Sequence, residues 1–311
     1  MFEVVIQPDT LHNLDSFVLP FLKSLDIRQS SRDTYHRQLR EFMVWRLQTQ
    51  TGTLVRQDLL DYKEYLKYDK NLTAFTIGGY LTAVRRFFEW LESMQIYPNI
   101  AKGIKGPRRK RGFKKDALTI DQAKLLLSTI DRSTLSGKRD FAMLNLMVRT
   151  GLRTIEIIRA TREDIGRQGG EPVLFIHGKG RDSKDELVLL TESTLVPIRD
   201  YFVARGRVRD QDPVFASHST KNWGKRLTTR SISRIAKNHL KAIDINDARL
   251  TAHSLRHTAI TFSLLAGATP QEARAMARHS DINTTLIYAH NINRISQAPE
   301  RKIDAFLDDT L

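Results

Sequence analysis

The sequence predicts a mainly α-helical protein of two domains, with one small β-hairpin in the second domain. A length of 311 residues suits two domains that each bury a core of their own. Apolar residues recur at spacings of three and four along most of the chain, which indicates amphipathic helices. One stretch, PVLFIHGKGRDSKDELVLL at 172–190, has two short apolar runs around a polar, glycine-containing turn, which indicates a hairpin.

The expected organisation is a helical domain at 1–101, a linker at 102–116, a mixed α+β domain at 117–290 and a C-terminal tail helix at 291–311. In the first domain, a weak helical pattern near 11–25 is followed by a helix with Ser31 as its candidate N-cap. Its apolar stripe consists of Tyr35, Leu39, Phe42 and Met43, and the stripe of a later helix consists of Leu81, Val84, Phe88 and Leu91. These segments predict a bundle of four or five helices. Four basic residues fall off the stripes and should face outward: Arg37, Arg40, Arg85 and Arg86.

The linker concentrates the positive charge of the chain. The segment KGIKGPRRKRGFKK at 102–115 holds eight Lys or Arg, no acidic residue, three Gly and one Pro. Its candidate contacts to a polyanion are Arg108, Arg109, Lys110 and Arg111. A net charge of +15 favours nucleic acid as the partner, although a merely solvated linker and basic surface stay possible at this point.

Composition excludes several other classes of protein. The chain has no Cys, which rules out disulfides, thiolate metal sites and a thiol nucleophile. No apolar run has the length of a membrane span, and the first residues, MFEVVIQPDT, lack the pattern of a signal peptide. We therefore expect a cytoplasmic protein without a membrane partner.

The second domain should begin with a helix at Thr119 or Asp121, followed by a helix that Gly151 closes. After the hairpin, whose strands should cover 173–176 and 187–190, a helix is expected around 231–243. The last part, 252–290, reads as three short helices. Thr269, Pro270 and Glu272 form a capping box at the start of the second of them.

These last helices gather an unusual set of side chains. Among them are three histidines, two candidate active-site arginines and a tyrosine: His253, His257, His279, Arg256, Arg278 and Tyr288. His253 and His257 have the spacing of a helical metal pair, but no Glu lies between them and Arg256 would repel a dication. A metal site is therefore disfavoured. A structural tyrosine or histidine is the ordinary alternative for each residue alone, and an active site for a phosphate is the alternative for the group.

The motifs HSLRH and ARHSDINTTLIYAH resemble the C-terminal signature of the tyrosine recombinases, or phage-type integrases. In that signature a His is followed three residues later by an Arg, then by a second His, and nine residues after that by the nucleophilic Tyr. The segment TGLRTIE is similar to the part that carries the family's first arginine, and HGKGRDSKDE to its lysine hairpin. The resemblance implies six catalytic residues, Arg153, Lys179, His253, Arg256, His279 and Tyr288, with Glu156 in a supporting role.

The resemblance also implies a C-shaped clamp, in which a helical core-binding domain and a catalytic domain close on double-stranded DNA. Tyr288 would attack a phosphodiester held by Arg153 and Arg256, giving a 3′-phosphotyrosine and a free 5′ hydroxyl. The histidines would add hydrogen bonds, His253 would accept the tyrosine proton, and Lys179 would protonate the departing 5′ oxygen. No metal, ATP or other cofactor is expected.

The expected partners are short inverted core sites in DNA and three further copies of the chain, in a homo-tetramer on two sites in the nucleoid. A mobile-element integrase and a Xer-like resolvase both fit this reading. Two other functions stay open: a type IB topoisomerase, and a catalytically silent DNA-binding regulator with the same fold.

Overall fold

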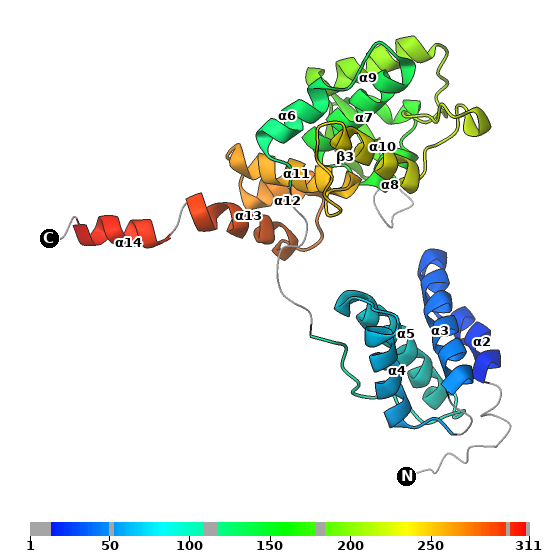
Figure 1. Cartoon of the computed structure of the whole chain (residues 1–311). Helices are drawn as coiled ribbons and strands as arrows, with labels where there is room; N and C mark the ends of the chain where they lie inside the picture. Colours follow the sequence, from blue (N-terminus) through cyan, green and yellow to red (C-terminus); the bar gives the residue numbers. More distant parts are fainter. Residues whose placement is uncertain (1–13, 50–52, 109–116, 178–183, 297–298, 309–311) are drawn as a thin grey trace. The chain divides into compact units, whose positions relative to one another are not determined.

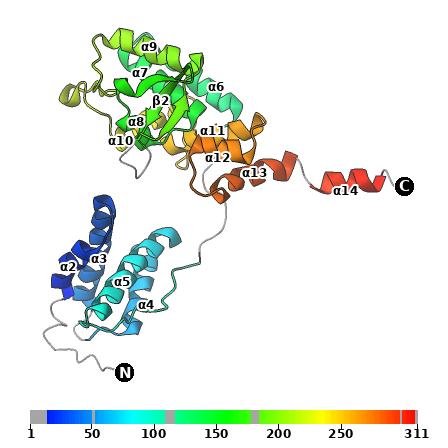
Figure 2. The ribbon, with the colours of Figure 1, turned by 180° about the vertical axis from the view of Figure 1, so that it is seen from behind.

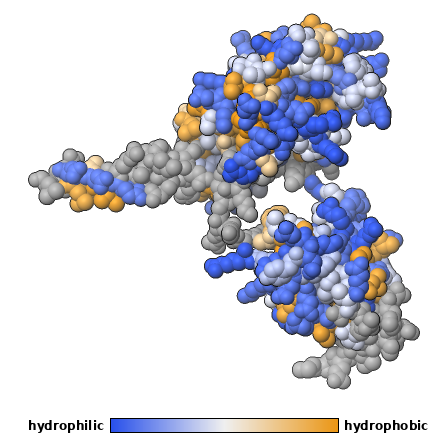
Figure 3. Space-filling view, viewed as in Figure 1, coloured by the Kyte–Doolittle hydropathy of each residue, from blue (hydrophilic) through white to orange (hydrophobic). Residues whose placement is uncertain are grey.

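The computed structural model describes residues 14–49, 53–108, 117–177, 184–296 and 299–308. The chain forms two compact units, Met1–Gly112 and Phe113–Leu311 (Figure 1). Both are mostly helical, and the second contains a three-stranded antiparallel sheet, so the predicted fold class is confirmed. Hydrophilic side chains cover most of the visible surface of each unit (Figure 3). Among the helices of the described part, none combines the length and apolar character that a membrane crossing requires.

The first unit is a helical bundle. Its elements are η1 (Leu14–Phe17), α2 (Val18–Ser24), α3 (Gln29–Thr49), α4 (Arg56–Tyr68) and α5 (Ala74–Ser93). Helix α3 begins at Gln29, so the prediction of Ser31 as its N-cap is wrong. The carbonyl of Arg28 already accepts the N–H groups of Ser31 and Arg32, and this starts the helix earlier.

The predicted apolar stripes form the core of this bundle. Leu39, Phe42 and Met43 of α3 are buried, as are the stripe residues of α5. The ring of Phe42 packs edge-on against Tyr62 of α4, with 5.0 Å between centroids, and against Phe88 of α5 at 6.1 Å. The packing extends to Ile104, which is buried in the same core three residues beyond the expected boundary at 101.

The second unit is built around α7. Its helices before the sheet are α6 (Ile120–Ser128), α7 (Leu135–Thr150), α8 (Thr154–Arg159) and η2 (Arg162–Asp164). Helix α6 has Thr119 as its N-cap, and α7 ends at Gly151, whose φ of 63° lies in the left-handed region, as the sequence indicates. Most residues of α7 from Ala142 to Val148 are fully buried, because α9 and α11 also pack against this helix.

The sheet has the order β1 (Ile165–Gln168), β2 (Glu171–Ile176) and β3 (Glu186–Leu189), with both pairs antiparallel (Figure 2). The predicted hairpin corresponds to β2 and β3, which pair from Val173 with Leu189 to Ile176 with Glu186. Strand β1 was not expected, because its sequence IGRQ contains one large apolar residue and shows no alternation.

The remaining helices are α9 (Glu192–Arg205), η3 (Thr220–Asn222), α10 (Thr229–Lys241), α11 (Ala252–Leu265), α12 (Pro270–Ala277), α13 (Asn283–Ser296) and α14 (Pro299–Asp308). Helix α9, which the sequence analysis missed, contains Pro197 and has no clear apolar stripe. Helices α11, α12 and α13 pack on one another (Figure 1). A small cluster of Ile260, Ala277 and Tyr288 lies buried between them.

Candidate active site

The site lies where the N-terminal ends of α8 and α11, the end of α12 and helix α13 converge. Helix α11 presents His253, Arg256 and His257 from its first two turns, while Leu255, Ala259 and Ile260 anchor its other side in the core. Helix α12 starts with the predicted capping box of Thr269 and Glu272, and it ends just before His279. The turns between these short helices bring side chains from 153 to 288 together.

Arg256 is buried and connects two helix ends. Its Nη1 donates a hydrogen bond to the carbonyl of Gly151 at 2.5 Å, and its Nη2 donates to the carbonyl of Ala277. The pKa of Arg256 falls to about 10, first because the side chain is buried and then because Arg153 and Arg278 add positive charge nearby. The site therefore concentrates positive charges that repel one another.

Arg153 is held on both sides of its guanidinium. Its Nη1 donates to Glu156 Oε1 at 2.7 Å, and its Nη2 donates to the carbonyl of Arg278 at 2.8 Å. Glu156 is fully buried. Its carboxylate also accepts a hydrogen bond from the backbone N–H of Arg153, and this contact caps the start of α8. Glu156 thus holds both the side chain and the backbone of Arg153.

Glu156 stays ionised although it is buried. Burial alone raises its pKa, but the charge of Arg278 and the hydrogen bonds and charge of Arg153 outweigh that effect, so the pKa lies below its usual value. Removing one cation from a buried ion pair leaves a charge that the protein interior cannot solvate. Arg153, Glu156 and Arg278 therefore act as one structural unit.

The tyrosine hydroxyl lies against a histidine. Tyr288, on α13, contacts His257 Nδ1 through its hydroxyl, and the two rings stack at 5.4 Å between centroids. The ring of His253 packs edge-on against that of His257, with 4.6 Å between centroids. The ring of His279 stacks on that of Tyr288, with 6.5 Å between centroids. Burial raises the pKa of Tyr288 to about 12, while the charge of Arg256 acts in the opposite direction.

His279 is neutral at physiological pH. Its Nδ1 is 2.8 Å from the hydroxyl of Thr285, which fixes the ring. Its pKa falls to about 4, chiefly through burial and then through the charges of Arg256, Arg153 and Arg278. The neutral ring can therefore donate a hydrogen bond to an anion without carrying a charge itself.

The structure brings five of the six expected catalytic residues into one region: Arg153, His253, Arg256, His279 and Tyr288. Lys179, the sixth, lies outside the described residues, as do Arg109, Lys110 and Arg111 of the linker. The other expected DNA-binding residues are exposed to solvent in the first unit: Arg37, Arg40, Arg85, Arg86 and Arg108. Within the described ranges no group of three or more His, Asp or Glu side chains could hold a metal ion.

Two contacts were not anticipated from the sequence. His257 was weighed as half of a metal pair and as one of the group that suggests a phosphate site, but no contact with Tyr288 was assigned to it, although its position one residue after Arg256 was a signal that it shares the same helix end. The contact of the Arg278 carbonyl with Arg153 has no sequence signal, because it joins main chain and side chain 125 positions apart.

Comparison with known proteins agrees with this geometry. Residues 116–294 match the model of the phage integrase family. The chain is 28% identical to tyrosine recombinase XerD of Listeria innocua serovar 6a over 289 residues, covering 89% of this chain and 93% of that protein. It is 30% identical to tyrosine recombinase XerC of Herpetosiphon aurantiacus over 283 residues, covering 86% and 88%.

The fold is also similar to a solved structure of the XerH site-specific recombinase bound to a palindromic difH substrate, in a post-cleavage complex. The TM-score is 0.72 at 18% sequence identity, with 95% of this chain and 92% of that chain covered. The fold and the arrangement of the site define a DNA strand-exchange enzyme of the tyrosine class. The chain belongs to the phage integrase family, as the resemblance implied, and it is a site-specific tyrosine recombinase.

Proposed function

We propose that this recombinase cleaves and rejoins double-stranded DNA through a 3′-phosphotyrosine formed on Tyr288. The observation that carries the proposal is the contact between the Tyr288 hydroxyl and His257 beside a group of buried, mutually repelling arginines. A phosphodiester would relieve that repulsion, since its oxygens carry the negative charge that the site needs. The guanidinium fork matches two phosphate oxygens and keeps its charge.

In the proposed reaction the Tyr288 oxygen attacks phosphorus, and the bond from phosphorus to the 5′ oxygen breaks. Arg153 and Arg256 stabilise the charge that develops on the non-bridging oxygens. The phenol proton passes to the histidine pair on α11, where His257 is in contact with the hydroxyl and His253 packs against His257. Lys179 gives a proton to the departing 5′ oxygen, and His279 donates a hydrogen bond to the phosphate.

The new bond to tyrosine keeps the energy of the phosphodiester that it replaces. A 5′ hydroxyl from a second duplex can therefore attack it and regenerate Tyr288 without a nucleotide or a metal ion. This exchange between duplexes separates a recombinase from a type IB topoisomerase, which rejoins the same duplex. The set of site residues also argues against a silent DNA-binding regulator of the same fold.

We assign the first unit and the linker to DNA binding. Residues 1–101 would form the core-binding domain, 102–116 the basic linker, 117–290 the catalytic domain and 291–311 the tail. The exposed arginines of α3, α5 and the start of the linker, together with Arg109, Lys110 and Arg111, would contact phosphates and position the duplex, as the two domains clamp it. Specificity for short inverted core sites would come from other contacts. We place the protein in the cytoplasm, with the nucleoid, where its substrate is.

The proposal is tested by trapping on nicked DNA. A nick just beyond the cleavage position lets the short 5′ product diffuse away, so the covalent complex accumulates and migrates as one band in a denaturing gel. The wild type should form this complex with its own core site in the presence of EDTA, and it should exchange strands between two duplexes. Relaxation of one duplex without exchange would indicate the topoisomerase, and DNA binding without any covalent complex would indicate the regulator.

We further propose that the tail helix α14 docks on a neighbouring protomer in a tetramer on two DNA sites. The helix exposes Ile303, Phe306 and Leu307 on one side, where Figure 3 shows an apolar face next to a hydrophilic one. A helix of ten residues is marginal by itself in water, so this face needs a docking surface. Burying its three large side chains would stabilise an assembly.

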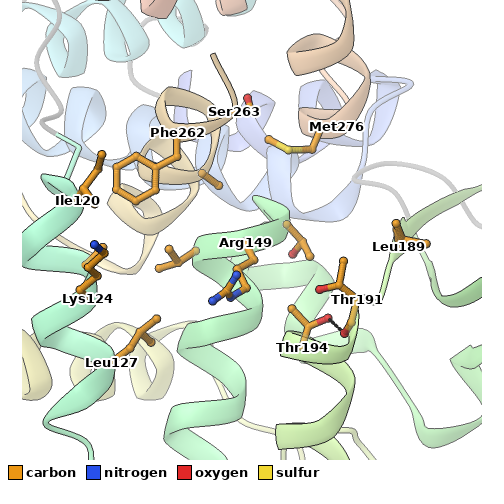
Figure 4. A pocket seen from close by; sticks show the side chains of 14 residues that line it. Ile120, Lys124, Leu127, Arg149, Leu189, Thr191, Thr194, Phe262, Ser263 and Met276 are labelled. Atoms are coloured by element: carbon orange, nitrogen blue, oxygen red, sulfur yellow. Dashed lines mark hydrogen bonds between the residues drawn. The ribbon is translucent and has the colours of Figure 1, made fainter. Parts of the chain in front are cut away.

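A pocket in the catalytic unit has the properties of an acceptor. Its volume is about 430 Å³, and its wall is largely apolar, with Leu127, Phe262 and Met276 among the lining residues (Figure 4). Lys124 and Arg149 also line it, and their charges complement Asp304 and Asp308, two of the three acidic residues of α14. The basic residues of this helix, Arg301 and Lys302, lie in its first turn. The pocket touches α11 and α12, so a docked helix would contact the elements that position Arg256 and His279.

Deleting residues 301–311 should give a soluble protein that binds one core site but loses cooperative pairing of two sites and strand exchange. Phe306→Asp should have the same effect with less disturbance, because a carboxylate in an apolar pocket is strongly disfavoured. Gel mobility on one-site and two-site DNA, together with exchange assays, measures both effects. Val203→Asp is the matched control, since Val203 is 83% exposed on α9. A truncated protein that still pairs sites and recombines at the wild-type rate would show that the tail does not act in a neighbour.

A further inference from the structure

Arg278 is a buried arginine of the site that the proposed reaction does not use. It follows the last residue of α12 and immediately precedes His279. Its φ of 54° and ψ of 48° lie in the left-handed region, where any residue with a β-carbon is strained and glycine is not. An arginine at such a position raises the question of what its side chain contributes.

The side chain of Arg278 is tied to both the carboxylate and the backbone of the site. Only 5% of it is exposed. Its Nη2 donates to Glu156 Oε2 at 2.9 Å, and its Nη1 donates to the carbonyl of Met276 at 2.6 Å. Glu156 therefore receives one arginine on each oxygen: Arg153 on Oε1 and Arg278 on Oε2.

The backbone of Arg278 contributes a second contact. Its carbonyl accepts the hydrogen bond from Arg153 Nη2 at 2.8 Å. Arg278 thus acts on Arg153 in two ways. Its carbonyl binds one side of the Arg153 guanidinium, and its side chain binds Glu156, which contacts the other side. The left-handed turn at Arg278 is the conformation in which both contacts occur together.

Arg278 also approaches the base of the hairpin that carries Lys179. Its Nε lies 3.8 Å from Glu186 Oε2, the first residue of β3, which pairs with Ile176 at the end of β2. This Nε is buried and makes no hydrogen bond within the part of the chain that the structure describes. Arg278 thus faces a second carboxylate, that of Glu186, besides the carboxylate of Glu156.

We propose that Arg278 is a positioning residue for DNA cleavage, which holds Arg153 in place through Glu156 and through its own carbonyl. The inference rests on the proposed function, because it assigns Arg278 a role in the same phosphate site. Arg278 acts through Arg153 and does not need to touch the substrate. If the positive charge of Arg278 were removed, Glu156 would be compensated mainly by Arg153. The guanidinium of Arg153 would then lose its fixed orientation.

This role predicts a particular dependence on pH. The charged groups that face Glu156 are Arg153 at the start of α8, Arg278 after α12 and Arg256 on α11. In the wild type they keep the pKa of Glu156 below its usual value, so the carboxylate is ionised throughout the neutral range. When Arg278 is removed, burial raises the pKa of Glu156, and protonation as the pH falls releases Arg153. A purely structural defect would instead reduce the rate by the same factor at every pH.

Three variants test the proposal: Arg278→Gly, Arg278→Met and Arg278→Lys. Glycine adopts the left-handed backbone without strain but lacks the cation, and methionine lacks the cation but keeps most of the side-chain volume. Lysine restores a positive charge near Glu156. Asp244→Gly is the matched control, because Asp244 has a φ of 60°, is exposed and also lies in the catalytic unit. Each protein is assayed for single-turnover cleavage of nicked core-site DNA between pH 6 and pH 8.5, and for its thermal midpoint.

We expect Arg278→Gly and Arg278→Met to cleave roughly 100-fold more slowly than the wild type, the size of effect that a misplaced group of the site produces. The deficit should grow by about three-fold or more as the pH falls from 8 to 6. Arg278→Lys should recover much of the rate and the wild-type pH profile, and Asp244→Gly should match the wild type. If Arg278→Gly does not fold, the comparison of the methionine and lysine variants decides.

Wild-type rates in the glycine or methionine variant would overturn the proposal, and so would a loss that is equal at all pH values or equal in the methionine and lysine variants. These outcomes differ from failure of the proposed function. In that case the wild type itself would form no covalent complex with DNA.

Discussion

Tyr288→Phe should abolish the covalent protein–DNA complex while leaving the folded protein and its DNA binding intact. The substitution removes only the hydroxyl that contacts His257, and the ring can keep its packing with Ile260 and Ala277. Since the attacking atom itself is removed, we expect no complex above background on nicked core-site DNA. Denaturing gels measure the complex, and gel mobility under native conditions measures the binding.

Tyr62→Phe is the matched control for this change. Tyr62 is a fully buried tyrosine of the first unit, and its hydroxyl makes no hydrogen bond within the described residues. Removal of that hydroxyl should leave cleavage at the wild-type rate. A normal yield of covalent complex from the Tyr288→Phe protein would mean that another residue is the nucleophile. Peptide mapping of the trapped complex would then identify it.

Arg153→Ala and Arg256→Ala should each bind DNA but cleave it on the order of 10³-fold more slowly, or worse. Arginines that stabilise the transition state of phosphoryl transfer contribute effects of this size in other enzymes. A loss of 10³-fold corresponds to about 4 kcal/mol of transition-state stabilisation. Single-turnover cleavage rates at saturating enzyme give the comparison, since they separate the chemical step from binding.

The two arginines should differ in what else they affect. Arg256 is buried and holds the carbonyls of Gly151 and Ala277, so its removal should also lower the thermal midpoint. Arg153 has a side chain that is 22% exposed, but it compensates the charge of the buried Glu156, so its loss should lower the midpoint through that carboxylate. Lysine at either position should restore little activity, because a point charge does not reproduce the fork.

Arg132→Ala controls for the loss of one positive charge in the same unit. Arg132 lies over the ring of Phe141 at 4.7 Å and is not part of the site. It should cleave at the wild-type rate. If Arg153→Ala or Arg256→Ala also cleaved within a few-fold of the wild type, the assignment of that arginine to the phosphate clamp would be wrong.

The local rules of the sequence anticipated most of the helices. The apolar stripe of Leu39, Phe42 and Met43, the N-cap at Thr119 and the capping box at Thr269 appear as expected, because each depends on residues within one or two turns. Strand β1 and helix α9 were missed for the same reason. The four residues of β1 have no alternation, and their strand conformation depends on hydrogen bonds to β2.

By itself, the sequence determined which chemical groups the site contains. Arg153, Arg256, His279 and Tyr288 were named because the motifs that carry them resemble those of the tyrosine recombinases. The tertiary structure decided how these groups meet. His257 reaches Tyr288 across 31 positions, and Arg278 reaches Glu156 and Arg153 across more than 120. Such contacts depend on how α8, α11, α12 and α13 pack, and burial then shifts the pKa values of Arg256, His279 and Tyr288. Packing and burial are properties of the folded chain, and no short stretch of sequence encodes them.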